Sequence, residues 1–259
     1  MAEPTLAAES FIWPDWRVPP RVRAVTTTRV GGVSRGAWQG LDLATHCGDQ
    51  LAAVATNRRA LCTALDLRTE PAWLEQVHGV GVVKVSAADG EAASPCRADA
   101  AWTDEVGAVC AILTADCLPV VLADASGSVV AVAHAGWRGL AGGVVEATVA
   151  ALPVAPASLS AWLGPCIGPT AFEVGEEVRV AFCDGDRGAI AAFRPTSRAG
   201  HWLADLPALA RRRLATNGVR TVFGGRWCTY SDPQRFFSYR RDGVTGRMAT
   251  LAWLDQGRG

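Results

Sequence analysis

Two histidines and one cysteine stand out because each lies where an apolar stretch of the chain begins or ends. His78 comes just before one such stretch, Cys117 comes before the second, and His134 follows the third. Two imidazoles and one thiolate are the donor set of a zinc site whose fourth position is open to water or substrate. The sequence therefore predicts a metal centre formed by these three residues.

Each of the three residues also has a structural interpretation when it is considered alone. A free cysteine in an apolar segment is most often packed as a small hydrophobic side chain. A histidine at the end of a strand can be a satisfied structural residue, and a His-Gly pair after a strand can simply form a turn. Ligands far apart in sequence have no spacing signature, so the metal site depends on the fold bringing three loop–strand junctions together.

The segment that holds Cys117 and His134 has the pattern of a hairpin of buried strands. Two apolar runs, 120–122 and 129–133, are separated by a turn-like Asp-Ala-Ser-Gly sequence at 124–127. In an antiparallel hairpin the start of one strand lies beside the end of the next. We therefore expect Cys117 and His134 to reach the same place in the fold.

Two further segments have the composition of an anion site. A helix expected at about 140–151 begins just beyond a Gly-Trp-Arg-Gly sequence, and a helix N-terminus beside Arg138 favours a bound negative charge. The glycine-rich loop 29–36, which contains Arg29 and Ser34, could direct backbone N–H groups to an anion. A flexible turn explains the composition of this loop equally well.

The remaining pattern predicts the elements that position these residues. A strand is expected over 22–28, and apolar residues at helical spacing predict a helix over 51–65. His46 precedes this helix, where it would either contact a substrate or cap the helix. Further strands are expected at 73–77, 80–85, 98–103, 108–113, 119–124, 128–133, 158–163 and 219–224, with helices at 174–184 and 203–216 and a closing strand that reaches 253. No repeat or linker divides the chain, so 1–259 is expected to form a single domain, with 1–20 as an arm that packs aromatic side chains onto it.

The bulk properties of the chain exclude several classes of protein. With 25 basic and 25 acidic residues the net charge is zero, so no overall field favours nucleic acid or an anionic membrane as a partner. The first residues lack the basic and apolar regions of a secretory signal, and no apolar run approaches the ~18 residues of a membrane span. The 8 cysteines form no CxxC pair, which indicates reduced thiols. We therefore expect a cytoplasmic protein.

Three segments carry a resemblance to a known family: Gln-Val-His-Gly at 76–79, Thr-Ala-Asp-Cys-Leu-Pro at 114–119 and Ala-His-Ala-Gly-Trp-Arg-Gly at 133–139. They resemble the signature segments of the YfiH/laccase-domain family, in which purine nucleoside phosphorylases once carried the label of multicopper polyphenol oxidases. Five other segments also match: the loop 29–34, His46 with Gly48 and Asp49, Asn57 with Arg58, 164–168 and the tail 239–249. The resemblance covers nearly the whole chain.

The resemblance implies an α/β fold, an α/β-β/α layered sandwich of mixed sheets similar to the catalytic domain of cytotoxic necrotizing factor toxins. It implies a zinc ion held by His78, Cys117 and His134. It also implies phosphorolysis of adenosine, inosine, guanosine and methylthioadenosine, with adenosine deaminase as a further activity. Purine nucleosides and phosphate are then the partners, and we expect a monomer or a small homo-oligomer.

This chemistry assigns roles to the residues around the metal. The open coordination position would activate water or polarise a substrate oxygen. Arg138 is the first choice for holding phosphate and Arg29 the second. Asp116 is either a general base or proton donor near the purine, or a structural carboxylate that orients a ligand. Similarity to the toxin suggests Cys117 as a nucleophile with His134 as its base, but nucleophilic attack and metal ligation by one sulfur are hard to combine, and ligation is preferred.

Three other functions compete with phosphorolysis. A multicopper oxidase needs a type-1 centre and a trinuclear cluster, which 4 histidines cannot supply, although a lone His₂Cys site can bind copper and support polyphenol oxidation. A hydrolase that edits peptidoglycan precursors would release an amino acid from a UDP-muramoyl substrate. A metal-stabilised binding module would hold zinc without turnover, and a Cys117→Ser variant of it would unfold.

Overall fold

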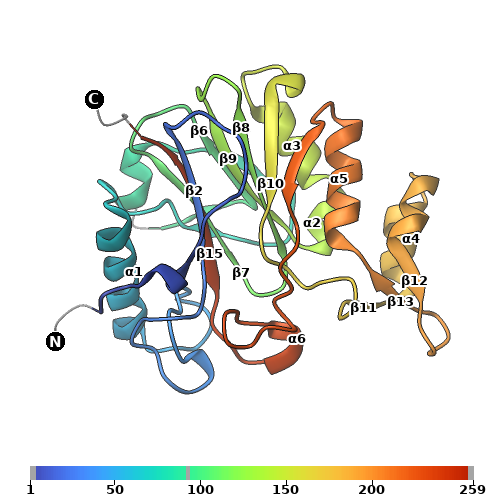
Figure 1. The fold of residues 1–259 in the computed structure, drawn as a ribbon, viewed down its shortest axis with the longest axis horizontal. Coiled ribbons are helices and arrows are strands. Elements are labelled where there is room, and N and C mark those ends of the chain that lie inside the picture. Colours follow the sequence, from blue (N-terminus) through green and yellow to red (C-terminus); the bar gives the residue numbers. More distant parts are fainter. Residues whose placement is uncertain (1–3, 92–93, 256–259) are drawn as a thin grey trace.

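The computed structural model describes residues 4–91 and 94–255 of the chain. Two β-sheets lie face to face at its centre, and helices cover the outer face of each sheet (Figure 1). This is the α/β-β/α layered arrangement of mixed sheets that the resemblance implied, and the expectation is confirmed.

The larger central sheet is six-stranded, with the order β14-β10-β8-β9-β6-β4. Neighbouring strands are antiparallel except for the parallel pairs at its two edges, β10 with β14 and β4 with β6. Both faces of β8 and β9 are buried, which is why their sequences are almost continuously apolar. The strands are β4 (Val82–Lys84), β6 (Ala100–Thr103), β8 (Leu118–Asp124), β9 (Val130–Ala135), β10 (Leu159–Leu163) and β14 (Thr221–Gly224).

The second central sheet is four-stranded and antiparallel, with the order β1-β2-β15-β7. Its strands are β1 (Phe11–Ile12), β2 (Val22–Thr27), β7 (Val109–Thr114) and β15 (Met248–Leu254). The hydroxyls of Thr26 and Thr250 lie 2.7 Å apart across β2 and β15. Strands from the two ends of the chain are therefore hydrogen-bonded neighbours in this sheet.

Apolar side chains form the layers between these elements. Ile112 of the smaller sheet packs with Val121 and Val132 of the larger one between the two sheets. The outer face of the smaller sheet packs on α1 (Leu51–Leu65), and the outer face of the larger sheet packs on α2 (Trp137–Gly142), α3 (Val144–Ala151) and α5 (Leu206–Thr216). Burying an aliphatic side chain of this kind contributes about 1.5–3 kcal/mol, so these contacts fix the layers.

A smaller unit stands beside the larger sheet at the right of Figure 1. It contains the three-stranded sheet β11-β13-β12 and α4. Its elements are β11 (Glu173–Gly175), α4 (Glu176–Cys183), β12 (Phe193–Pro195) and β13 (His201–Ala204). The chain also forms a two-stranded sheet of β3 (Leu74–Glu75) and β5 (Cys96–Arg97), the short helix α6 (Tyr239–Asp242), and 3-10 helices at Ala8–Ser10, Gly36–Trp38, Ala87–Glu91, Pro156–Ser158 and Arg187–Ala192.

Several predicted elements need correction. The single helix expected at 140–151 is wrong: the helical segment begins at Trp137 and is broken into α2 and α3 at Gly143, whose φ of 103° lies in the left-handed region. The helix expected from 174 begins at Glu176, because the chain first forms β11. The helix expected over 203–216 begins at Leu206, where the carboxylate of Asp205 accepts a hydrogen bond from the Ala208 amide and caps the helix.

The N-terminal arm, expected over 1–20, is described from residue 4 onward. Its β1 pairs with β2, and Trp16 packs against the cluster between the two central sheets. That the whole chain forms one domain stays a prediction.

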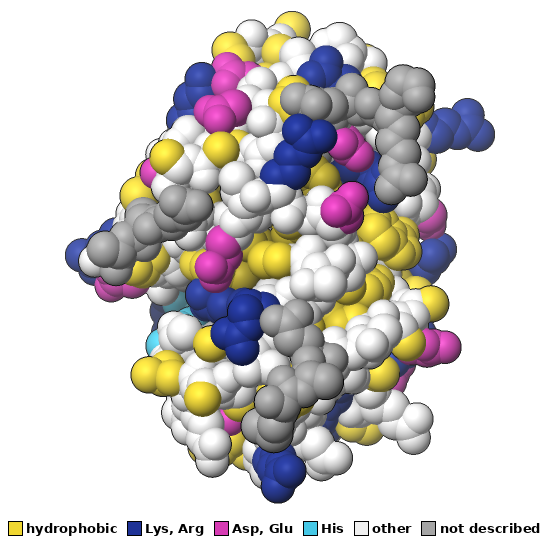
Figure 2. All heavy atoms as spheres, turned by 90° about the vertical axis from the view of Figure 1, so that its left-hand side faces the viewer, with side chains coloured by type: hydrophobic (Ala, Val, Ile, Leu, Met, Phe, Trp, Pro, Cys, Tyr) yellow, Lys and Arg dark blue, Asp and Glu magenta, His cyan; other side chains and the backbone are white. Residues whose placement is uncertain are grey.

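Two surface properties bear on the partners of the chain. No helix within residues 4–91 and 94–255 is long and apolar enough to cross a membrane. On the face shown in Figure 2, basic and acidic side chains are interspersed, in keeping with the zero net charge of the sequence.

Candidate metal centre

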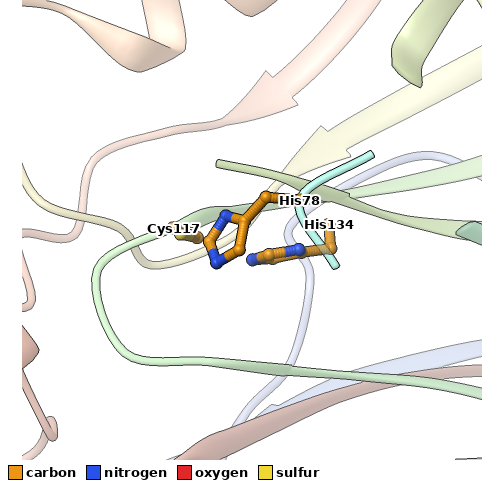
Figure 3. Close-up of side chains that lie close together, drawn as sticks. All are labelled: His78, Cys117 and His134. Atoms are coloured by element: carbon orange, nitrogen blue, oxygen red, sulfur yellow. The ribbon is translucent and has the colours of Figure 1, made fainter. Parts of the chain in front are cut away.

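The three predicted ligands lie together at one end of the larger sheet. His78 is in the loop between β3 and β4, Cys117 is in the turn before β8, and His134 is in β9. Their ligand atoms all lie within 4.8 Å of one another, and Figure 3 shows the side chains grouped together. One zinc ion with Zn–N of about 2.0 Å and Zn–S of about 2.3 Å can reach such a set. The structure therefore brings together the residues that the sequence singled out.

The hairpin explains how Cys117 and His134 meet. In the antiparallel register of β8 and β9, Pro119 is paired with His134 and Leu118 with Ala135. Cys117 comes immediately before Leu118, so it lies beside the end of β9. The predicted hairpin and its consequence for these two residues are confirmed.

Asp99 connects the His78 loop to His134, and it was not among the residues predicted from the sequence. Its buried carboxylate accepts hydrogen bonds from the backbone amides of Val77, His78 and Gly79 at 3.2, 2.9 and 2.7 Å. Oδ1 of Asp99 also lies 2.8 Å from Nδ1 of His134. When that nitrogen carries the proton, Nε2 is left as the free ligand atom of His134. Burial opposes ionisation of Asp99, but His134 and the amide donors outweigh it and lower its pKa.

The backbone adopts an unfavourable conformation at two positions of the site. Two non-glycine residues at the site have a positive φ: His78 at 58° and Asp116, next to Cys117, at 93°. A non-glycine residue in a sparsely populated region costs roughly 1–3 kcal/mol and persists only where its surroundings hold it. Hydrogen bonds from the backbone amides of His78 and Gly79 to the carboxylate of Asp99 provide that restraint on one side of the site.

Gly136 leaves the space in which the ligands converge. A Cβ at this position would lie 2.8 Å from Sγ of Cys117 and 2.9 Å from Nδ1 of His78. The φ of Gly136 is −60°, so any residue could adopt its backbone conformation, and the requirement for glycine is one of space. A soft thiolate and two imidazoles around a space that a methyl group would fill are a donor set that suits zinc or copper.

The electrostatics of the cluster favour the ligating form of the cysteine. Burial raises the pKa of the Cys117 thiol, but the charges and hydrogen bonds of His134 and His78 outweigh it and lower the pKa to about 6. Burial lowers the pKa of His134, but Cys117 and Asp99 raise it to about 9. By contrast, burial raises the pKa of the Cys47 thiol to about 11. Of these two cysteines, Cys117 is therefore the one that provides a thiolate for a metal at neutral pH.

This difference can be measured in the metal-free protein. We expect the thiolate absorbance at 240 nm to rise with a midpoint near pH 6, because Cys117 loses its proton well below the ordinary range of a thiol. One equivalent of zinc should remove the step, since the bound sulfur no longer titrates. The Cys117→Ala variant is the control and should lack the step at every zinc concentration. A step of the same size in that variant would contradict the assignment.

Asp116 binds protein groups through both of its carboxylate oxygens. Oδ1 accepts a hydrogen bond from the hydroxyl of Thr229 at 2.5 Å. Oδ2 accepts from the hydroxyl of Ser238 at 3.0 Å and from the amide of Arg240 at 2.7 Å. These contacts tie the 229–240 segment to the turn that carries Cys117. Such contacts suit a structural carboxylate, and both roles considered for this residue, orienting carboxylate and general base, stay predictions.

The side chains of Arg29 and Ser34 are both bonded to other groups of the protein. The Arg29 guanidinium donates to the carbonyls of Gln39 and Pro233 at 3.1 and 3.2 Å and lies over the ring of Phe237. The Ser34 hydroxyl donates to Asp49 at 2.5 Å. Both residues hold the glycine-rich loop in place, and substrate binding by either of them stays a prediction.

His46 and Arg138 line two different hollows. His46 lies with Gln76 in a pocket of about 520 Å³. Burial and the positive charges of Arg247 and Arg58 lower the pKa of His46, which favours its uncharged ring. Arg138 is exposed in the first turn of α2, two residues after Gly136, and lines a groove of about 420 Å³.

The comparisons with known proteins agree on one family. A family model described as multi-copper polyphenol oxidoreductase laccase matches residues 23–255. Purine nucleoside phosphorylase PA4543 of Pseudomonas aeruginosa is 51% identical over 245 residues, which are 95% of this chain and 98% of the relative. Purine nucleoside phosphorylase YfiH of Escherichia coli is 50% identical over 244 residues, which are 94% and 98% of the two chains.

Solved structures of similar chains have the same fold. Neisseria meningitidis protein NMB0706 superposes with a TM-score of 0.90 at 48% identity, covering 95% of this chain and 99% of its own. YlmD from Geobacillus stearothermophilus superposes with a TM-score of 0.88 at 30% identity, covering 97% of this chain and 98% of its own.

Proposed function

Because this chain belongs to the YfiH family of laccase-like domains, whose similar members are named purine nucleoside phosphorylases, we propose that it is a zinc-dependent enzyme of that kind. Its substrates in this proposal are adenosine, inosine, guanosine and methylthioadenosine, each cleaved with phosphate. The observation that carries the proposal is the convergence of His78, Cys117 and His134 at a site backed by the buried carboxylate of Asp99.

The proposed reaction exchanges one bond at the sugar for another. An oxygen of hydrogen phosphate bonds to C1′ of the ribose while the C1′–N9 bond breaks. The leaving purine takes up the proton that hydrogen phosphate gives up, and the products are the free base and ribose 1-phosphate. A bound zinc ion would supply Lewis-acid polarisation of an oxygen at this site. We assign Cys117 the role of ligand, since its lowered pKa provides the thiolate that a metal requires.

The surrounding residues have supporting roles in the proposal. Asp99 fixes the ring of His134 and the backbone of the His78 loop. Asp116 positions the turn of Cys117 through its bonds to the 229–240 segment. Arg138 supplies positive charge for phosphate from the first turn of α2. Deamination of adenosine is proposed as a second activity of the same centre.

Two alternatives use the same residues. Copper bound by the His₂Cys set would give polyphenol oxidation, which the description of the family model names. A hydrolase acting on peptidoglycan precursors would need the same open metal position. Cytoplasmic location and a monomer or small homo-oligomer stay predictions.

Base release from nucleosides tests the proposal directly. We expect the zinc-loaded protein to release free base from adenosine and inosine only when phosphate is present, with ribose 1-phosphate as the second product. His78→Ala and Cys117→Ala should lose this activity by roughly 100-fold or more while remaining folded, because each removes one ligand. The fold is checked by circular dichroism and the product by chromatography.

The outcomes separate the candidates. Release that does not depend on phosphate would indicate hydrolysis and contradict phosphorolysis. No release from any of the four nucleosides would overturn the proposal, and release of an amino acid from a UDP-muramoyl substrate would then support the editing hydrolase. If the Cys117→Ala protein is unfolded and the native protein is inactive, the metal has a structural role.

A further inference from the structure

A groove near the metal centre is lined by basic side chains from separate parts of the chain. It has a volume of about 420 Å³ and is lined by residues of α2, of α6 and of the small unit that contains β11 and β13. Its lining includes Arg138 of α2, Arg198 of the turn before β13, His201 at the start of β13, and Arg240 of α6. Three arginines and a histidine that the sequence distributes over more than a hundred positions face one hollow.

Two of these arginines are held with their N–H edges available. The guanidinium of Arg138 lies 4.4 Å from the centre of the Trp137 ring, and that of Arg240 lies 5.3 Å from the centre of the Phe172 ring. One N–H group of the Arg240 guanidinium donates a hydrogen bond to the carbonyl of Glu173 at 2.7 Å. A guanidinium that lies over a ring keeps its in-plane donors free, and those donors match an oxyanion.

Some of the guanidinium N–H groups in the groove have no hydrogen-bond partner among the described residues. Within the described part of the chain, the guanidinium groups of Arg138 and Arg198 have no hydrogen-bond acceptor. The side chains of Glu173 and Glu177 also line the groove, so its positive charge is only partly balanced from within. A basic groove with unpaired donors favours a compact ligand that carries more than one negative charge.

Backbone contacts connect this groove to the metal ligands. The amide of Arg240 donates to Asp116, the residue before Cys117, at 2.7 Å. Arg138 follows Gly136 by two residues, and a Cβ at Gly136 would lie within 3 Å of both Cys117 and His78. Arg138 therefore belongs to the segment that borders the ligand atoms, and the backbone of Arg240 is bonded to the residue before Cys117.

We propose that this groove is the phosphate subsite of the enzyme, with Arg138 and Arg240 as the residues that bind the oxyanion. Arg198 and His201 form its opposite wall on the small unit. The ligand class is a phosphate group, either inorganic phosphate or the phosphate of ribose 1-phosphate. This inference rests on the proposed phosphorylase function and adds Arg240, Arg198 and His201 to it.

Kinetics with separate variation of the two substrates test the groove. Arg138→Met and Arg240→Met remove the charge and keep the length of the side chain, and Arg240→Lys restores the charge. We expect each methionine variant to raise the KM for phosphate by roughly 10–100-fold and to leave the KM for inosine nearly unchanged, because a charge-assisted hydrogen bond to the oxyanion is lost. Arg220→Met, an exposed arginine before β14, is the matched control and should keep the native constants.

A binding measurement accompanies the kinetics. Phosphate should raise the melting temperature of the native protein and of Arg220→Met, and this shift should be much smaller in Arg138→Met and Arg240→Met. Arg240→Lys should recover part of it. The reverse reaction with ribose 1-phosphate and hypoxanthine should show the same rise in KM as phosphate does.

These measurements distinguish an incorrect phosphate subsite from an incorrect phosphorylase function. Phosphorolysis with an unchanged KM for phosphate and for ribose 1-phosphate in both methionine variants would overturn the subsite and leave the phosphorylase intact. A rise in the KM for inosine alone would also overturn it, whereas a rise in the KM for ribose 1-phosphate alone would assign the groove to the phosphate of the sugar phosphate. If the native protein releases no base, the proposed function fails, and an equal phosphate-induced thermal shift in native and variant proteins would then overturn the groove as well.

Discussion

Replacing Gly136 by alanine is expected to remove the metal and the activity together. The added Cβ would lie 2.8 Å from Sγ of Cys117 and 2.9 Å from Nδ1 of His78, distances that force a ligand to move. Because the φ of −60° suits alanine, the effect comes from this contact and not from backbone strain. We expect zinc to bind roughly 100-fold more weakly, with about 1–3 kcal/mol lost from the free energy of unfolding through overpacking.

Zinc content and a chelator competition measure this effect, and urea unfolding measures the cost in stability. Gly185→Ala is a suitable control, since a Cβ at that exposed position would contact nothing within 4 Å. It should retain full zinc binding and activity. A Gly136→Ala protein with one zinc per chain and native affinity would refute the assignment of the space beside Gly136 to the metal.

Asp99→Asn is expected to weaken the metal site and the fold at once. The carboxylate serves four donors, namely three backbone amides of the His78 loop and Nδ1 of His134. An asparagine would direct its own N–H₂ group at some of these donors and leave them unsatisfied in a buried place. We expect a loss of about 2–4 kcal/mol in the free energy of unfolding and roughly 10–100-fold in zinc affinity.

Asp124 provides a matched control at the opposite end of the same hairpin. Its carboxylate is also buried and accepts from the amides of Ser126, Ser128 and Val129. Asp124→Asn should therefore reduce stability by a comparable amount without changing zinc affinity. Equal loss of zinc affinity in the two variants would show that general destabilisation, and not the contacts of Asp99, sets the affinity.

The elements with strong periodicity could be predicted from the sequence, and the short ones could not. The helix over 51–65 agrees with α1 because its apolar residues recur at helical spacing. The strands β12 and β13 were missed because they have only 3 and 4 residues and carry no apolar alternation. The break at Gly143 was missed because a glycine inside an apolar run does not reveal its φ.

In the site, contacts within a hairpin could be predicted from the sequence, and contacts between distant positions could not. Cys117 and His134 could be placed together because a hairpin relates them through a local turn. Asp99 was missed because a carboxylate next to alanines looks like a polar interruption of a strand. The partners of Asp116 could not be found either, since Thr229 lies 113 positions further along the chain. Contacts of that kind are decided by packing of the whole molecule.

The place of β15 in its sheet has a consequence for biosynthesis. β15 is the last strand along the chain, yet it lies between β2 and β7, and Thr26 and Thr250 meet there across 224 positions. The ribosome must therefore synthesise the chain through residue 254 before β2 and β7 gain their shared neighbour. Until then both strands carry an unpaired edge, which is a hazard for aggregation. The hairpin that brings Cys117 and His134 together consists of local contacts, which form faster than distant ones. We therefore expect the nascent chain to bring two metal ligands together before the smaller sheet is complete.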